Sequence, residues 1–150
     1  MLDELESIER SGNLATGAHA LASALTDGRA KMWIVLRTLV LRRNYRELFD
    51  FGHYVPLQAV GSRSDHVIAF VRRHAGKTAI TVGGRLWMKL GGEAGHLPVG
   101  AESWGDTALE TGPLKGEFEN VYTGERIRID GGISLSRVFA TFPAALLVQV

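Results

Sequence analysis

The longest apolar stretch of the chain runs from residue 30 to residue 41 and is interrupted only by Lys31, Arg37 and Thr38. It contains no Gly or Pro, and at about 100° per residue its apolar positions fall on two faces of a helix. A broad face carries Met32, Trp33, Leu36, Leu39 and Val40, and a second face, roughly opposite, carries Ala30, Ile34 and Leu41. A helix with one apolar stripe needs one neighbour, so this pattern predicts a helix covered on both sides.

The residues that flank this segment favour the same helix. Asp27 precedes it and is a good N-cap, because its carboxylate can accept a hydrogen bond from an amide of the first turn. Arg42 and Arg43 follow it, where positive charge suits the helix dipole. Upstream, leucines and an isoleucine recur at helical spacing among acidic residues up to Gly12, and the Ala-rich segment 13–26 predicts a second short helix.

From His53 onward the pattern changes to short runs rich in β-branched and aromatic residues, separated by Gly-containing turns. We expect strands at 53–60, with Pro56 at an edge or bulge, and at 66–73, 77–84, 85–90, 107–110, 117–123, 125–130, 132–136 and 144–150. Residues 91–105 are expected to form a long loop that carries Trp104. Strands at this spacing predict an antiparallel sandwich or barrel.

The predicted fold class is therefore α+β, with N-terminal helices followed by an antiparallel β-sandwich. We expect two parts, a helical segment 1–52 and a sheet domain 53–150. A chain of 150 residues is long enough for a substantial core.

Composition narrows the function classes. The net charge is +1 and 22% of the residues are charged, which gives no electrostatic reason to expect a nucleic acid or a membrane surface as partner. There is no cysteine, no secretory signal pattern at the N-terminus, and no apolar run long enough to span a bilayer. These features predict a soluble, cytoplasmic protein.

An ordered set of short motifs covers most of the chain. The motifs are Asp27-Gly28-Arg29 with Lys31; Leu39, Leu41, Arg42 and Arg43; Leu48-Phe49; Gly52, Tyr54, Pro56 and Leu57; Ala69-Phe70 with Arg72; Arg85-Leu86; Trp104-Gly105-Asp106-Thr107; Thr123-Gly124; and Phe142-Pro143-Ala144 with Leu146-Leu147. In content and order they resemble the C-terminal region of the maltooligosyltrehalose synthases, a family of the α-amylase clan of glycoside hydrolases. The resemblance begins near Asp27, and the preceding residues match only as a helical segment.

The resemblance implies a place for the two-faced helix. In the family this region is the last helix of the catalytic (β/α)8 barrel followed by a C-terminal β-sandwich, so one helix face should meet the sandwich and the other the barrel. Such a barrel takes about 250 residues, and the family's catalytic carboxylates have no counterpart here. We therefore expect a fragment of an enzyme in trehalose biosynthesis, an isomerase that works by intramolecular transglucosylation on maltooligosaccharides without a cofactor.

The residues themselves suggest little chemistry. The acidic residues of the sheet part stand mostly next to Gly, Ser or other charges, as turn residues do, and the histidines lack metal-binding spacing. We expect no catalytic residue and no metal site. Sugar recognition would need an exposed aromatic ring, for which Trp87, Trp104 and Tyr122 are the candidates. For Trp104, a ring that covers the end of the core explains its motif equally well.

Three hypotheses follow. The first is a non-catalytic C-terminal domain that packs against and stabilises the catalytic barrel. The second is an autonomous carbohydrate-binding module that uses Trp87 or Trp104. The third is a structural fragment that forms a homodimer within residues 28–43, through the second helix face (Ala30, Ile34 and Leu41). Without a partner this face would expose apolar area to water, at a free-energy cost of about 25 cal/mol per Å².

Overall fold

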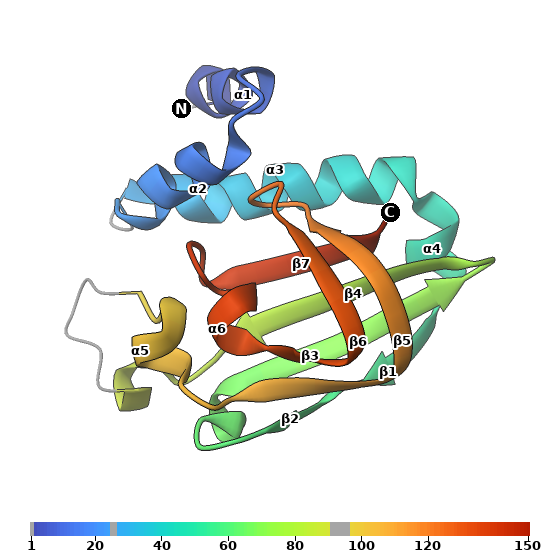
Figure 1. Ribbon diagram of the computed structural model, residues 1–150. Coiled ribbons are helices and arrows are strands. Elements are labelled where there is room, and N and C mark those ends of the chain that lie inside the picture. Colours follow the sequence, from blue (N-terminus) through green and yellow to red (C-terminus); the bar gives the residue numbers. More distant parts are fainter. Residues whose placement is uncertain (1, 25–26, 91–96) are drawn as a thin grey trace.

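The computed structural model describes residues 2–24, 27–90 and 97–150. Helices come first and strands follow, with short helices between the later strands (Figure 1). In chain order the elements are α1 (Leu2–Arg10), α2 (Leu14–Ala22), α3 (Arg29–Asn44), α4 (Arg46–Phe51), β1 (His53–Pro56), β2 (Gln58–Val60), η2 (Ser64–His66), β3 (Val67–His74), β4 (Lys77–Gly84), η3 (Trp87–Leu90), α5 (Gly100–Trp104), β5 (Ala108–Asn120), β6 (Arg126–Ser134), α6 (Leu135–Val138) and β7 (Ala144–Gln149). The predicted α+β class is confirmed.

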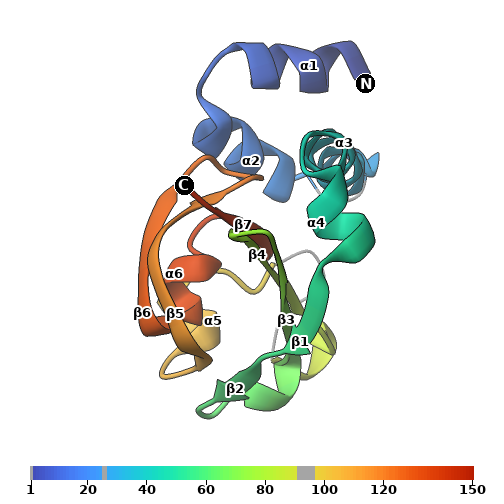
Figure 2. The ribbon, with the colours of Figure 1, turned by 90° about the vertical axis from the view of Figure 1, so that its right-hand side faces the viewer.

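The seven strands form one antiparallel sheet in the order β1-β3-β4-β7-β5-β2, with β6 paired to the other side of β5. Only Leu57 separates β1 from β2, yet β1 pairs with β3 and β2 pairs with β5. The strands β1 and β2, which lie at the two ends of the strand order, are therefore consecutive in the chain. This is possible because the sheet curls round on itself (Figure 2). Pro56 ends β1, the strand that pairs only with β3, as an edge position requires.

The sandwich in the strict sense, two separate sheets packed face to face, is not confirmed, because every strand pair belongs to one continuous hydrogen-bonded sheet. The reason lies in β5, whose thirteen residues pair with β2 and β6 near its start and with β6 and β7 near its end. The long strand β5 therefore joins, through its two ends, the strands that we expected to form two separate sheets.

Two apolar cores result from this curl. The first lies inside it and is built from inward side chains of the strands together with Trp104, Leu135 and Phe139. The second lies between the outer face of β4 and β7 and the helices, and it includes Leu5, Leu21 and Trp33. Whether residues 1–52 and 53–150 fold as separate domains stays a prediction.

Helix α3 begins close to where the sequence indicates. Gly28 is its N-cap residue, in the left-handed conformation with φ 77°, and it has no side chain to cap the helix. The carboxylate of Asp27 accepts a hydrogen bond from the backbone N–H of Arg29 over 2.9 Å. Asp27 is therefore not the N-cap residue that we predicted, although its carboxylate does accept a hydrogen bond from the first turn as expected.

Four later segments differ from their predicted structure. The strands expected at 107–110 and 117–123 form the single strand β5, which ends at Asn120. Residues 85–90, expected as a strand, contain the 3₁₀-helix η3, because β4 has already reached the ends of both its partners at Gly83 and Gly84. The expected loop 91–105 contains helix α5, and its residues 91–96 lie outside the described part of the chain. The strands expected at 125–130 and 132–136 form the single strand β6, which ends at helix α6.

Candidate functional site

Helix α3 is fixed to the sheet by polar contacts from its inner face. The indole nitrogen of Trp33 donates to the carbonyl of Tyr122 over 3.0 Å, and the hydroxyls of Thr38 and Tyr122 are 2.9 Å apart. Arg37 donates from Nε to the carbonyl of Val121 over 3.0 Å and pairs with Glu9 of α1 through Nη1. Burial raises the pKa of Tyr122, so its hydroxyl stays neutral in this contact.

The face of α3 that the structure leaves exposed is not the predicted one. Ala30 and Leu41 are buried and Ile34 is half-buried against the same core, because α2, β7 and the turn after β5 cover this side. The N-terminal segment thus covers the face that we expected to be free. Self-association stays a prediction, but the exposed apolar residues of α3 are on the opposite side.

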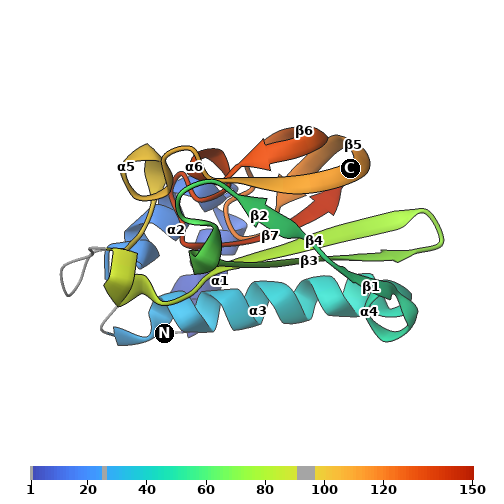
Figure 3. The same ribbon diagram turned by 90° about the horizontal axis from the view of Figure 1, so that it is seen from below.

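Exposed apolar side chains lie on α3 and on neighbouring elements of the same side of the molecule. We define this outer apolar surface by six exposed side chains from α3, α4, β1 and β3: Met32, Val35, Leu39, Phe51, Tyr54 and Ile68. These four elements lie on one side of the molecule (Figures 2 and 3). Apolar patches larger than a few hundred Å² are typical of interaction sites.

The alternation of β3 explains why the sheet contributes to this surface. Val67, Ala69 and Val71 point into the curl, so Ile68 and Phe70 point to its outer face. Helix α3 covers the outer face of β4 and β7, but it does not reach β1 and β3 (Figure 2). The ring of Tyr54 on β1 lies 4.7 Å from that of Phe70 and extends the exposed part.

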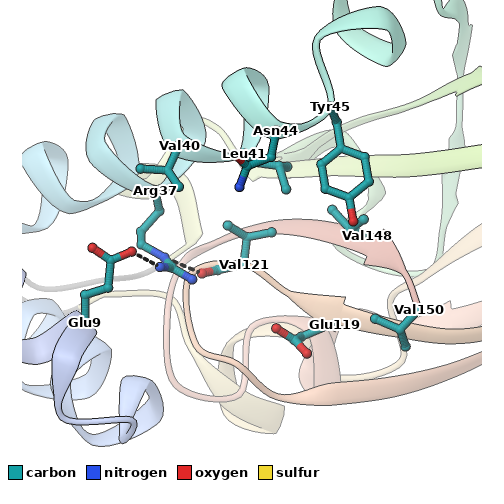
Figure 4. A pocket seen from close by; sticks show the side chains of 10 residues that line it. All are labelled: Glu9, Arg37, Val40, Leu41, Asn44, Tyr45, Glu119, Val121, Val148 and Val150. Atoms are coloured by element: carbon teal, nitrogen blue, oxygen red, sulfur yellow. Dashed lines mark hydrogen bonds and ion pairs between the residues drawn. The ribbon is translucent and has the colours of Figure 1, made fainter.

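A pocket of about 340 Å³ lies on the other side of α3, between α1, α3 and the ends of β5 and β7 (Figure 4). Its apolar lining is Val40, Leu41, Val121, Val148 and Val150, and its polar lining is Glu9, Arg37, Asn44, Tyr45 and Glu119. No single segment of the sequence carries this set, because α1 supplies Glu9, α3 supplies four residues and the ends of β5 and β7 supply most of the others. The sequence therefore gave no signal for the pocket.

The two predicted sugar-binding tryptophans lie in different places. Trp104 is fully buried, donates from its ring nitrogen to the carbonyl of Pro98 over 2.7 Å and packs against Phe139. Its ring therefore presents no free face to a sugar in this structure. Trp87 is 37% exposed on η3 and lies against Gly84, where an added Cβ would be 2.6 Å from its ring nitrogen. Sugar binding by either residue stays a prediction.

The described carboxyl groups resemble structural rather than catalytic groups. Hydrogen bonds lower the pKa of four aspartates below the usual value. The donors are the backbone N–H of Arg29 for Asp27, Arg46 for Asp50, Ser62 for Asp106 and Lys115 for Asp130. A general acid of a glycosidase needs the opposite shift. Within residues 2–24, 27–90 and 97–150 no group of His, Asp and Glu could hold a metal.

No helix in the described ranges is long and apolar enough to cross a membrane. The two cations at the start of α3, Arg29 and Lys31, differ in their surroundings. Arg29 pairs with Asp27 over 2.7 Å and with Glu4 of α1, which raises the pKa of Arg29, and Lys31 is exposed.

Comparison with known structures relates the chain to one enzyme family. No protein-family model matches it, and no curated protein does. Among solved structures, it superposes on a point mutant of maltooligosyltrehalose synthase from Arthrobacter ramosus with a TM-score of 0.59 and 33% identity over 80% of this chain. The chain is related to the maltooligosyltrehalose synthases. A noncanonic maltogenic α-amylase from Thermotoga neapolitana also matches, at 12% identity and a TM-score of 0.43 over 71% of this chain and 23% of that one.

The extent of the match limits what it shows. The chain spans 14% of the length of the maltooligosyltrehalose synthase structure, so it corresponds to a part of such an enzyme. The resemblance found in the sequence motifs is confirmed at the level of this family.

Proposed function

We propose that this chain is the non-catalytic C-terminal domain of a maltooligosyltrehalose synthase and that it packs against and stabilises the catalytic (β/α)8 barrel. The parent activity would be the isomerisation of the reducing-end α-1,4 linkage of a maltooligosaccharide to an α,α-1,1 linkage. The family relationship supports the enzyme, and the order of the sequence motifs supports the C-terminal position. A cytoplasmic location fits the absence of cysteine.

The outer apolar surface is the observation that carries the proposed role. Leu39 is 59% exposed and Phe51 70% exposed, although both belong to elements whose other faces are buried. Burial of a Leu or Phe side chain is worth about 1.5–3 kcal/mol, so docking of this surface would stabilise both partners. A catalytic role within the described residues would instead need two carboxyl groups close together, one of them a general acid with a raised pKa.

Association with a separately supplied barrel tests the proposal. The catalytic part of a maltooligosyltrehalose synthase would be expressed as a second polypeptide, together with this chain or with its Leu39→Glu variant. We expect the wild-type chain to co-purify with the barrel and to raise its melting temperature. We expect Leu39→Glu to abolish both effects while its own circular dichroism spectrum stays unchanged.

A matched control comes from the opposite side of the molecule. Arg128→Glu introduces a carboxylate at an exposed position of β6, a strand that lies on the opposite side of the molecule from β1 and β3 (Figure 2). This variant should bind the barrel as the wild type does. A barrel that neither binds nor is stabilised by the wild-type chain would contradict the proposed role.

A further inference from the structure

The pocket between α1, α3 and the sheet contains polar groups that no other lining residue engages. Among its ten lining residues, Figure 4 marks interactions only between Arg37 and Glu9 and between Arg37 and Val121. The amide of Asn44 and the hydroxyl of Tyr45 stay free within this set. The nearest cation to Glu119 is Arg126, at 3.8 Å, which is longer than a hydrogen bond.

The charges around the pocket argue for a neutral ligand. Arg37 is the lining residue with a positive charge, and Glu9 and the carbonyl of Val121 already occupy two sides of its guanidinium. Glu119 adds a negative charge at the sheet end. Within the lining a phosphate or carboxylate would therefore meet no free cation and would be repelled by Glu119. A cation beside the lining is Lys77, whose Nζ lies 5.1 Å from the ring centroid of Tyr45 and over the ring rather than at its hydroxyl.

The shape and chemistry of the lining define the ligand further. Val121, Val148 and Val150 form an apolar side, and the hydroxyl of Tyr45 points toward Val148 (Figure 4). A pyranose ring has the complementary structure, with apolar C–H faces and a rim of hydroxyls that suits carboxylate, amide and phenol groups. The volume of about 340 Å³ lies at the lower end of ligand pockets, about 300–1,000 Å³, which fits one ring rather than a long oligosaccharide.

We propose that this pocket binds a terminal glucosyl ring of a neutral maltooligosaccharide, with Asn44, Tyr45 and Glu119 as hydrogen-bonding groups. The assignment of a neutral pyranose as the ligand follows from the geometry and charges of the pocket. The choice of a maltooligosaccharide rests on the proposed function. This site is distinct from the two predicted tryptophans. It also lies on the opposite side of α3 from the outer apolar surface, so a sugar and a docked barrel would not compete for the same side chains.

Titration of the ¹⁵N-labelled chain with maltotriose, followed by NMR, tests the site. We expect saturable shifts of the amides of Asn44, Glu119 and Val148 in the millimolar range. Tyr45→Phe and Glu119→Gln each remove one hydrogen-bonding capability with little change in shape, and each should weaken binding about two- to tenfold. Glu110→Gln, an exposed glutamate near the other end of β5, should bind as the wild type does.

Two results would overturn the inference. One is an absence of shifts at the pocket at tens of millimolar maltotriose, including the case in which the shifts appear around Trp87 instead. The other is binding of glucose 6-phosphate as tight as that of glucose, because the charges of the pocket disfavour an anion. Neither result would affect the proposed docking role, which the co-purification experiment tests independently.

Discussion

The indole nitrogen of Trp33 donates a hydrogen bond of 3.0 Å to the carbonyl oxygen of Tyr122, across a sequence separation of 89 residues. Trp33 has no exposed surface, and the guanidinium of Arg37 lies 5.5 Å from its ring centroid. This contact joins the helical segment to the turn that follows β5. It makes α3 an integral part of the fold rather than an appendage to the sheet.

The first prediction follows from this contact. Trp33→Ala should lower the free energy of unfolding by about 3–5 kcal/mol, the usual cost of truncating a buried aromatic side chain. Trp33→Phe should cost about 1–3 kcal/mol, because it leaves the buried carbonyl of Tyr122 without its donor. Urea unfolding measures both values. Trp87→Ala serves as the control on an exposed tryptophan, and an equal loss there would contradict the distinction.

The second prediction concerns self-association. If the wild-type chain dimerises at high concentration, the exposed stripe of Met32, Val35 and Leu39 should form the contact. Leu39→Glu should then sediment as a monomer with unchanged stability. Ile34→Glu should instead lower stability, because Ile34 packs against the core between the helices and the sheet. A dimer that survives Leu39→Glu would contradict this assignment.

The third prediction concerns pH. Asp106 accepts hydrogen bonds from the hydroxyl and the backbone N–H of Ser62 at 2.6 Å and 3.0 Å, which lowers its pKa from 3.8. A lowered pKa in the folded state adds stability above the unfolded pKa, and this stability is lost as the pH falls through the folded value. Asp106→Asn should therefore be less stable than the wild type at pH 7, and the difference should shrink below pH 3.8.

Urea midpoints of the two proteins across this pH range measure the effect of Asp106. Asp65→Asn is a suitable control, because the side chain of Asp65 is exposed and lies near the same turn. Arg85 donates to the backbone carbonyl of Asp65 and not to its carboxylate, so the substitution keeps this hydrogen bond. A stability difference for Asp106→Asn that does not change on acidification would contradict the assigned contact.

The fourth prediction concerns the packing of α1 against α2. A Cβ at Gly17 would lie 2.2 Å from the Cγ2 of Ile8. Gly→Ala within a helix usually stabilises by about 0.5–1 kcal/mol, but here we expect a loss, because Ile8 must move. Hydrogen exchange of residues 2–10 should become faster in Gly17→Ala. The exposed His19→Ala on the same helix should leave the exchange unchanged.

The sequence predicts elements better than it predicts their partners. The periodicity of 2–10 and 29–44 indicates helices, and the alternation of 66–73 and 77–84 indicates the hairpin of β3 and β4, because these signals are local. The two apolar faces of α3 are also evident from its sequence. Which face remains exposed is not, because that depends on α2 and on the turn at Tyr122, which are remote from α3 in the chain.

The same limit applies to the candidate sites. A tryptophan in a Gly-rich motif is equally compatible with a core and a surface position, and only the contacts of Trp104 with Pro98 and Phe139 place it in the core. The strand expected at 85–90 has suitable residues, but its neighbours in the sheet end before it begins. The pocket beside α1 draws its lining from four elements, so no spacing within one segment could indicate it.

The ion pair between Glu9 and Arg37 has a thermodynamic consequence. Glu9 belongs to α1, and the same helix is tied to α3 by the pair of Glu4 with Arg29. Glu9 is the residue of α1 that lines the pocket, so a ligand that contacts Glu9 and the docking of α1 on α3 favour each other by the same free energy. Salt screens such partly exposed pairs, and the occupancy of the pocket and the order of α1 should therefore decline together as ionic strength rises.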